Sequence, residues 1–160
     1  MTELRAAALA RLDVFVGEWA VEARFRDEVP ITQPAPGEDP QLRIRFEWAL
    51  ERQFLMQRTE TPFPEAPDSL SIVSVNAETG AYTQHYFDSR GVVRTYRMTL
   101  RDDVWTLLRD RPDFSPLEFA QRYTGTFGGD GRTITGRWET SHDGGATWEH
   151  DFDLNYRRTH

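Results

Sequence analysis

The sequence predicts an all-β fold, a ten-stranded antiparallel up-and-down barrel with a short N-terminal helix closing one end. Three observations predict it. The chain holds ten Phe, five Trp and five Tyr in 160 residues, and most of them lie in segments that alternate polar and apolar residues. Ten such segments are joined by turn signals. An open meander of this length would leave two exposed edges, which closure into a barrel removes.

The elements follow from local patterns. Leu4, Ala8 and Leu12 lie at near-helical spacing with charged residues between them, which predicts a short amphipathic helix over 3–13. The predicted strands cover 17–26, 41–50, 52–60, 70–77, 81–89, 92–101, 104–110, 117–127, 132–141 and 147–158. The length suits one domain with its own core, so we expect residues 1–160 to form a single barrel domain.

The two ends of the predicted barrel differ, because alternate connections of a meander fall at the same end. One end carries five connections, and three of them are long and rich in proline. The five connections are 27–40, 61–69, 88–91, 110–116 and 141–145. The short turns and the helix share the other end. This predicts a closed base and an open mouth, as in barrels that hold a small ligand.

Composition restricts the possible partners. The formal net charge of −7 offers no basic surface for phosphate backbones, so we expect no nucleic-acid partner. The chain has no cysteine, which excludes disulfides and thiolate sites and fits a reducing compartment. Charges interrupt the N-terminal segment and no later segment could span a membrane, so the expectation is a cytoplasmic protein without a membrane partner. Nothing in the sequence predicts an oligomeric state.

Gly17-Glu18-Trp19 opens the first predicted strand just after the helix, and Arg157 and Arg158 end the last strand. This arrangement resembles the calycin superfamily of lipocalins and fatty-acid-binding proteins, in which a Gly-x-Trp packs its indole against an arginine of the final strand. The stretches TQHYFDSRG and WETSHDGGATWEHDFDLNY also resemble a bacterial group of calycin-like proteins of unknown function. The resemblance implies a calycin-like barrel in which Trp19 and Arg158 stack at the base as structural residues.

The stretch SHDGGATW, 141–148, matches the Ser-x-Asp-x-Gly-x-Thr-Trp signature of an Asp box, which recurs once per blade in sialidase-like propellers. A single copy in 160 residues cannot supply a propeller. We interpret it as a structural hairpin, in which Asp143 accepts backbone N–H groups, Gly144 and Gly145 allow positive φ, and Trp148 packs beneath.

Two histidines are candidate ligand-binding residues. The alternation of the last strand places His150 on the inner face between Trp148 and Phe152. Barrels of the nitrobindin type bind haem through a histidine of a late strand, so the resemblance implies haem as an alternative ligand. Hydrogen bonding to Tyr96 or Tyr123 is the alternative role for His150. The direction of His85 is ambiguous. Neither histidine has the third ligand that a divalent metal requires, so we expect no metal site.

Two arginines complete the candidate site. Arg58 alternates with Phe54 and Met56, and Arg94 with Tyr96 and Met98. Fatty-acid-binding barrels clamp a ligand carboxylate with inward arginines, for which the planar guanidinium is suited. The alternative is that both side chains lie near strand ends and extend to water.

The function that the sequence predicts is binding of a small hydrophobic or amphipathic molecule, with a carboxylate or carbonyl, inside the barrel. The candidate ligand-binding residues are His150, His85, Arg58, Arg94, Tyr96 and Tyr123. Three alternatives stay open: a haem-binding barrel with His150 as axial ligand, a small enzyme of isomerase, cyclase or hydrolase type using both histidines, and an interaction module whose interior is filled by side chains.

Overall fold

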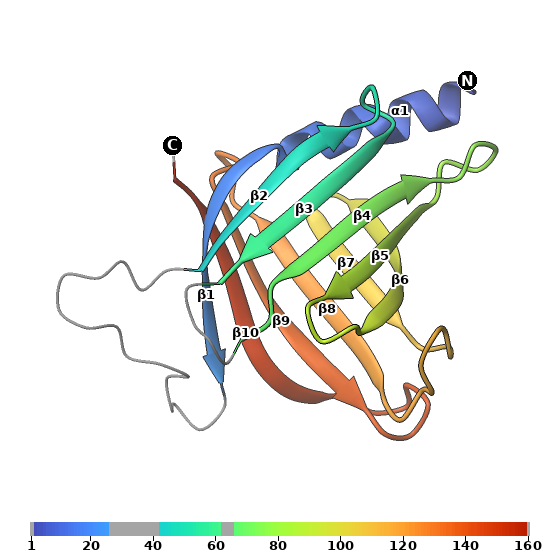
Figure 1. The fold of residues 1–160 in the computed structure, drawn as a ribbon, viewed down its shortest axis with the longest axis vertical. Coiled ribbons are helices and arrows are strands. Elements are labelled where there is room, and N and C mark those ends of the chain that lie inside the picture. Colours follow the sequence, from blue (N-terminus) through green and yellow to red (C-terminus); the bar gives the residue numbers. More distant parts are fainter. Residues whose placement is uncertain (1, 26–41, 62–65, 160) are drawn as a thin grey trace, which may run out of the picture.

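The computed structural model describes residues 2–25, 42–61 and 66–159, and over these residues the chain forms a closed barrel of ten antiparallel strands with one short N-terminal helix (Figure 1). This confirms the predicted fold class. Each strand pairs with its predecessor, and β1 (Gly17–Phe25) pairs with β10 (Glu149–Arg158) to close the ring. The other strands are β2 (Leu42–Ala49), β3 (Phe54–Glu60), β4 (Ser69–Val75), β5 (Tyr82–Asp88), β6 (Val93–Arg101), β7 (Val104–Arg109), β8 (Ala120–Phe127) and β9 (Thr133–Ser141).

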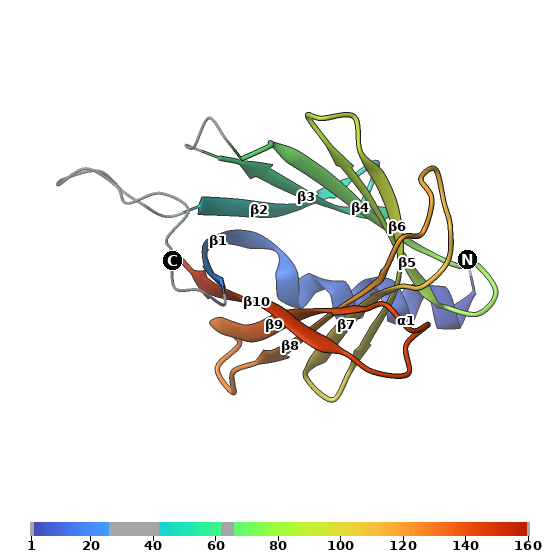
Figure 2. The same ribbon diagram turned by 90° about the horizontal axis from the view of Figure 1, so that it is seen from below.

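Helix α1 (Glu3–Arg11) continues into a 3-10 turn (Leu12–Phe15) and covers one end of the barrel. The Tyr82 hydroxyl donates to the Ala8 carbonyl (2.6 Å), and Arg5 donates to Gln53 Oε1 (2.7 Å) in the β2–β3 turn. Figure 2 shows α1 spanning the space enclosed by the ring of strands. The helix and the short turns therefore share one end, as predicted, which we call the closed end.

The connections at the opposite end are only partly described. The predicted connection 27–40 lies wholly outside the described residues, and residues 62–65 of the connection 61–69 lie outside them. The connections at 88–91, 110–116 and 141–145 are described, and all three lie at the end opposite α1 (Figure 1). None of the helices in the described part of the chain has the length and apolar character needed to cross a membrane.

Aromatic rings fill the closed end. Phe15, Trp105 and Tyr123 are at most 1% exposed. The rings of Phe15 and Trp105 meet edge to face with centroids 4.9 Å apart, and those of Trp105 and Tyr123 with centroids 5.1 Å apart. Such offset geometry is the favourable one for aromatic pairs. These rings form the core of the barrel.

Two glycines make room for one of these rings. A Cβ atom added to Gly136 would lie 2.2 Å from the Tyr123 hydroxyl oxygen, and one added to Gly125 would lie 2.7 Å from Tyr123 Cε2. Any larger residue at these positions would therefore clash with the ring. The Tyr123 hydroxyl donates to the Leu154 carbonyl (3.0 Å) on β10. The Gly125 and Gly136 positions thus let Tyr123 lie against the barrel wall.

The predicted contact between Trp19 and Arg158 is present where β1 meets β10. The Arg158 guanidinium lies 4.3 Å from the centroid of the Trp19 ring, and the two residues are register partners. Arg158 also donates to the carbonyls of Val14, Val16 (2.7 Å) and Gly131 (3.0 Å). One side chain therefore ties together the end of the 3-10 turn, the start of β1 and the β8–β9 turn.

Gly17 allows this arginine to approach. Its φ is +128°, a conformation that residues with a side chain rarely adopt, and an added Cβ would lie 2.9 Å from Arg158 Nη1. The Trp19 indole N–H donates to the Phe15 carbonyl (2.8 Å), which fixes the ring beneath the guanidinium. Gly17, Trp19 and Arg158 therefore act as one structural unit.

We expect Arg158→Leu to lower the free energy of unfolding by about 2 to 4 kcal/mol, because it removes the cation–π contact and leaves carbonyls without their charged donor. Urea unfolding followed by tryptophan fluorescence measures the change. Arg101→Leu, at an exposed position on β6, is the matched control and should change stability little. Equal stability of the two variants would show that the contact contributes nothing to closure.

Candidate ligand-binding site

The inward side chains of the barrel are more exposed to solvent at one end than at the other. Near α1 the inward side chains are fully buried, as Trp19 and Ile134 are. Toward the opposite end Gln57, Tyr86 and Trp138 are only half-buried, although their positions in the strands point inward. Solvent therefore reaches the inner wall at this end, which we call the open end.

An inward arginine without a charged partner lies near the open end. Arg94 and Tyr96 are successive inward residues of β6, as the sequence predicted. Arg94 Nη1 donates to Gln121 Oε1 (3.1 Å), and the Tyr96 hydroxyl donates to the same oxygen (3.3 Å). Over the described ranges, no carboxylate lies within 4.0 Å of the Arg94 guanidinium. Arg94 is thus a half-buried cation held by a neutral acceptor.

A second inward arginine, Arg109 on β7, was missed by sequence reasoning. It is 5% exposed and makes two parallel hydrogen bonds to Asp113, of 2.8 and 2.9 Å. The Thr95 backbone N–H donates to the same carboxylate (2.9 Å). Hydrogen bonds from Arg109, with those from the backbone, hold the pKa of Asp113 well below its usual range. Because Arg109 is neutralised in this way, it differs from Arg94. Its alternation with Trp105 and Leu107 was the signal that could have revealed it.

The inward tyrosines are neutral hydrogen-bond donors. Burial raises the pKa of Tyr96 and of Tyr123 above the ordinary value for a tyrosine. The two hydroxyls are committed to Gln121 and to the Leu154 carbonyl respectively. Tyr96 therefore belongs to the polar cluster around Arg94, whereas Tyr123 is part of the wall.

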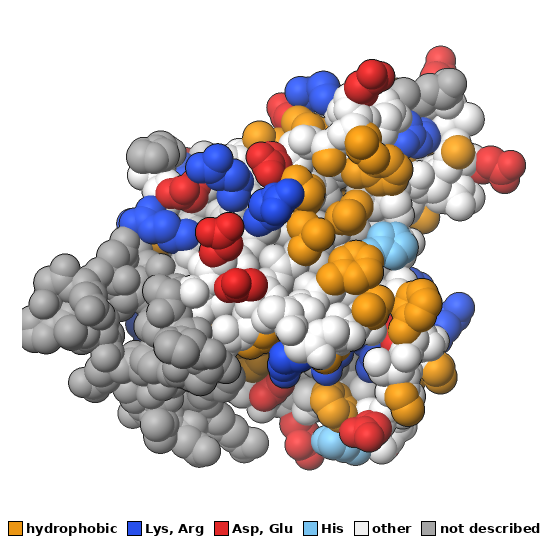
Figure 3. Space-filling view, in the orientation of Figure 1, with side chains coloured by type: hydrophobic (Ala, Val, Ile, Leu, Met, Phe, Trp, Pro, Cys, Tyr) orange, Lys and Arg blue, Asp and Glu red, His pale blue; other side chains and the backbone are white. Residues whose placement is uncertain are grey.

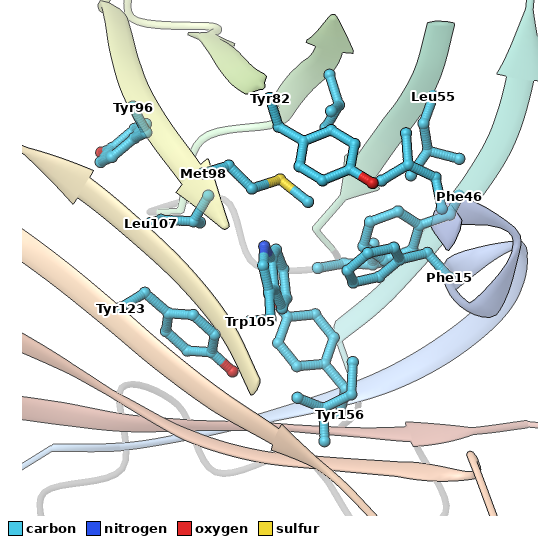
Figure 4. Packing of buried hydrophobic residues seen from close by; sticks show 14 of the residues in the cluster. Phe15, Phe46, Leu55, Tyr82, Tyr96, Met98, Trp105, Leu107, Tyr123 and Tyr156 are labelled. Carbon is cyan, nitrogen blue, oxygen red and sulfur yellow. The ribbon is translucent and has the colours of Figure 1, made fainter. Parts of the chain in front are cut away.

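Two buried polar atoms of the inner wall have no hydrogen-bond partner among the described residues: Oε1 of Gln84 and Nε1 of Trp105. The two side chains are 5% and 1% exposed. Figure 4 shows the indole nitrogen of Trp105 at the end of the ring nearer Met98. Buried polar groups in proteins are normally paired, so these two atoms are exceptions. Sequence reasoning did not single out either atom.

The prediction that His150 points inward was wrong. A β-bulge interrupts the pairing of β10 with β9: His150 pairs with Glu139, yet Phe152 pairs with Trp138. The extra residue shifts the alternation by one, which moves His150 to the outer face while Phe152 stays inside. His150 Nε2 lies 2.8 Å from Asp153 Oδ1 on the outer surface. His150 therefore contacts neither the interior nor the tyrosines proposed as its partners.

His85 and Arg58 also point outward. His85 Nε2 lies 3.1 Å from Ser74 Oγ on the outer face of β4 and β5. Arg58 is 55% exposed and pairs with Glu47 at 3.3 Å. The ambiguity of His85 is thus resolved, and the prediction of an inward Arg58 was wrong.

The error at Arg58 has a clear cause. Its neighbours on the same face of β3 belong to an apolar patch on the outer surface, spread over β3, β4 and β5 (Figure 3). The patch consists of Phe54, Met56, Leu70, Ile72 and Phe87. The inner face of β3 carries Leu55, Gln57 and Thr59, so it is the less apolar of the two. The apolar face of this strand was therefore not the inner one.

The Asp-box turn has the predicted hydrogen bonds and glycine conformations, but the prediction that Trp148 lies on the inner face was wrong, because the bulge in β10 shifts the alternation for Trp148 as it does for His150. Asp143 Oδ1 accepts from the Thr147 backbone N–H (2.8 Å) and from the Ser141 hydroxyl (2.8 Å), and Gly144 and Gly145 have φ of 72° and 94°. Trp148 packs on the outer surface, where the Arg122 guanidinium lies 4.2 Å from its ring centroid. The hairpin is a structural turn with no contact to the polar cluster around Arg94.

The described residues hold no group of three or more His, Asp or Glu side chains arranged to bind a metal ion. No protein-family model and no curated protein matches the chain. The candidate site consists of Arg94, Tyr96 and Gln121 on the inner wall, together with the unpaired atoms of Gln84 and Trp105.

The Asp143 carboxyl should titrate at a pH near 2. Hydrogen bonds from Thr147 and Ser141 lower its pKa from 3.8 to about 2. A lowered folded-state pKa stabilises the hairpin fully above about pH 4, and this contribution is lost as the pH falls through about 2. Carbon-detected NMR of the Asp143 side chain measures the midpoint. A midpoint near 4 would contradict the hydrogen bonds.

Proposed function

We propose that the barrel binds a small, mostly apolar molecule in its interior and holds a carboxylate or carbonyl group of that molecule at Arg94. The observation that carries the proposal is the half-buried, inward guanidinium without a carboxylate partner among the described residues. A charge withdrawn from water is costly unless it is paired. A ligand carboxylate would supply the missing partner.

The surroundings of Arg94 support an apolar body for the ligand. Trp138 is half-buried on the inner wall, and its ring meets the Tyr96 ring with centroids 5.7 Å apart. Apolar walls with a few converging polar groups are the usual composition of small-molecule sites. The planar guanidinium adds specificity, because it can make two parallel hydrogen bonds to one carboxylate.

Two of the competing functions, haem binding and histidine-dependent catalysis, lose the residues on which they depended. A haem-binding barrel required His150 as an inward axial ligand, and a histidine-dependent enzyme required His150 and His85 together in the interior. Both side chains lie on the outer face. The calycin-like relationship stays part of the proposal, supported by the closed ten-stranded ring and the Trp19–Arg158 contact.

Titration calorimetry with oleate and with oleyl alcohol tests the proposal. The two probes share an apolar chain and differ in the charged head group. We expect oleate to bind the protein more tightly than oleyl alcohol. Arg94→Gln should weaken oleate binding at least about tenfold, since hydrogen bonds to charged groups are strong, and should leave the alcohol nearly unaffected.

Arg58→Gln is the matched control, because Arg58 is also an arginine flanked by apolar residues but lies on the outer surface. It should bind both probes as the unmodified protein does. The proposal would be refuted if neither probe bound, or if Arg94→Gln and Arg58→Gln bound oleate equally well. If neither probe bound, the outer apolar patch over β3, β4 and β5 would become the surface to examine.

A further inference from the structure

We propose that the bound molecule carries a hydroxyl group on its apolar part, and that Gln84 and Trp105 bind this hydroxyl deep in the barrel. The inference rests on the proposed function and adds the chemical class of the ligand: a hydroxylated amphipathic acid. It starts from the unpaired Oε1 of Gln84 and Nε1 of Trp105, which are an acceptor and a donor.

Three tyrosine hydroxyls of the inner wall already donate to other acceptors. The Tyr82 hydroxyl donates to the Ala8 carbonyl at 2.6 Å. The hydroxyls of Tyr96 and Tyr123 donate to Gln121 and to the Leu154 carbonyl. These three donors are committed elsewhere, and Gln84 Oε1 has no hydrogen-bond partner among the described residues, so a ligand group can supply one.

The two unpaired atoms belong to one side of the barrel wall. Gln84 on β5 is the register partner of Tyr96 on β6. The next inward residue of β6 toward the closed end is Met98, and the Trp105 nitrogen is at the end of its ring nearer Met98 (Figure 4). The site between them therefore spans the levels of Tyr96 and Met98.

Arg94 lies on the same strand, nearer the open end. Inward positions on β6 follow in the order Arg94, Tyr96 and Met98, and each step of two residues advances about 7 Å along the strand. The site between Gln84 and Trp105 thus lies roughly 7 to 13 Å farther along the strand direction than Arg94, toward the closed end. A ligand with its carboxylate at Arg94 would place the middle of an extended chain here.

A hydroxyl is a small group that can serve both atoms. It accepts a hydrogen bond from the indole N–H and donates one to the amide oxygen. A carbonyl would satisfy Trp105 alone, and an apolar chain would leave both atoms unpaired. Sites built to bind a hydroxyl discriminate against analogues that lack it, because their own polar groups then stay buried without partners.

Oleate and ricinoleate form the matched pair of probes, since ricinoleate is oleate with a hydroxyl in the middle of the chain. Titration calorimetry of the intact protein should give an affinity for ricinoleate about tenfold higher than for oleate. Gln84→Met removes the acceptor and Trp105→Phe removes the donor. Each variant should reduce the ratio of the two affinities while oleate binding persists.

Gln57→Met is the control, because Gln57 is a second inward glutamine, on β3, and should leave the ratio unchanged. Gln84→Met should also unfold at the same temperature as the unmodified protein or higher, since it removes an unpaired buried acceptor. This keeps the test valid if Trp105→Phe, at the centre of the core, does not fold.

The outcomes separate this inference from the proposed function. A higher affinity for ricinoleate that Gln84→Met removes supports it. Equal binding of the two probes, or a preference that survives in Gln84→Met, overturns it while the ligand site at Arg94 stands. Absence of binding by both probes overturns the proposed function and this inference together.

Discussion

The pairing of β1 with β10 is the constraint on which the rest of the structure depends. A meander of ten strands has two free edges, and this one ladder removes both. The ladder is secured at the closed end by Trp19 and Arg158, whose guanidinium also binds carbonyls of the 3-10 turn and of the β8–β9 turn. Without this ladder the ring would open, and the inward side chains would be exposed to solvent.

The two halves of the barrel interior differ in the side chains that line them. The aromatic rings around Trp105 and helix α1 fill the half at the closed end, where packing supplies most of the hydrophobic stabilisation. The other half carries polar groups that a filled core would exclude, including Arg94 and Gln121. Arg109 is balanced by Asp113, whereas Arg94 has no such partner among the described residues. This contrast locates the proposed ligand site within the barrel.

Sequence alternation predicted inward positions for Arg94 and Arg58, and the prediction was correct for Arg94 and wrong for Arg58. In β6 the inner face is the more apolar one, so the choice of face by hydrophobicity was correct. In β3 the outer face carries Phe54 and Met56, part of the patch over β3, β4 and β5, and the same reasoning selected the wrong side. Period-two patterns separate the faces of a strand, but they do not say which face is enclosed.

The sequence by itself determined the ten strands, the helix at one end and the Trp19–Arg158 contact, because these depend on local periodicity, turn residues and their order along the chain. The tertiary structure decided which side chains share the interior. One extra residue in β10 moved His150 outside, and strand pairing brought Arg94 beside Gln121 from β8. Bulges and pairing between distant strands have weak local signals, so the site emerges only when the ring closes.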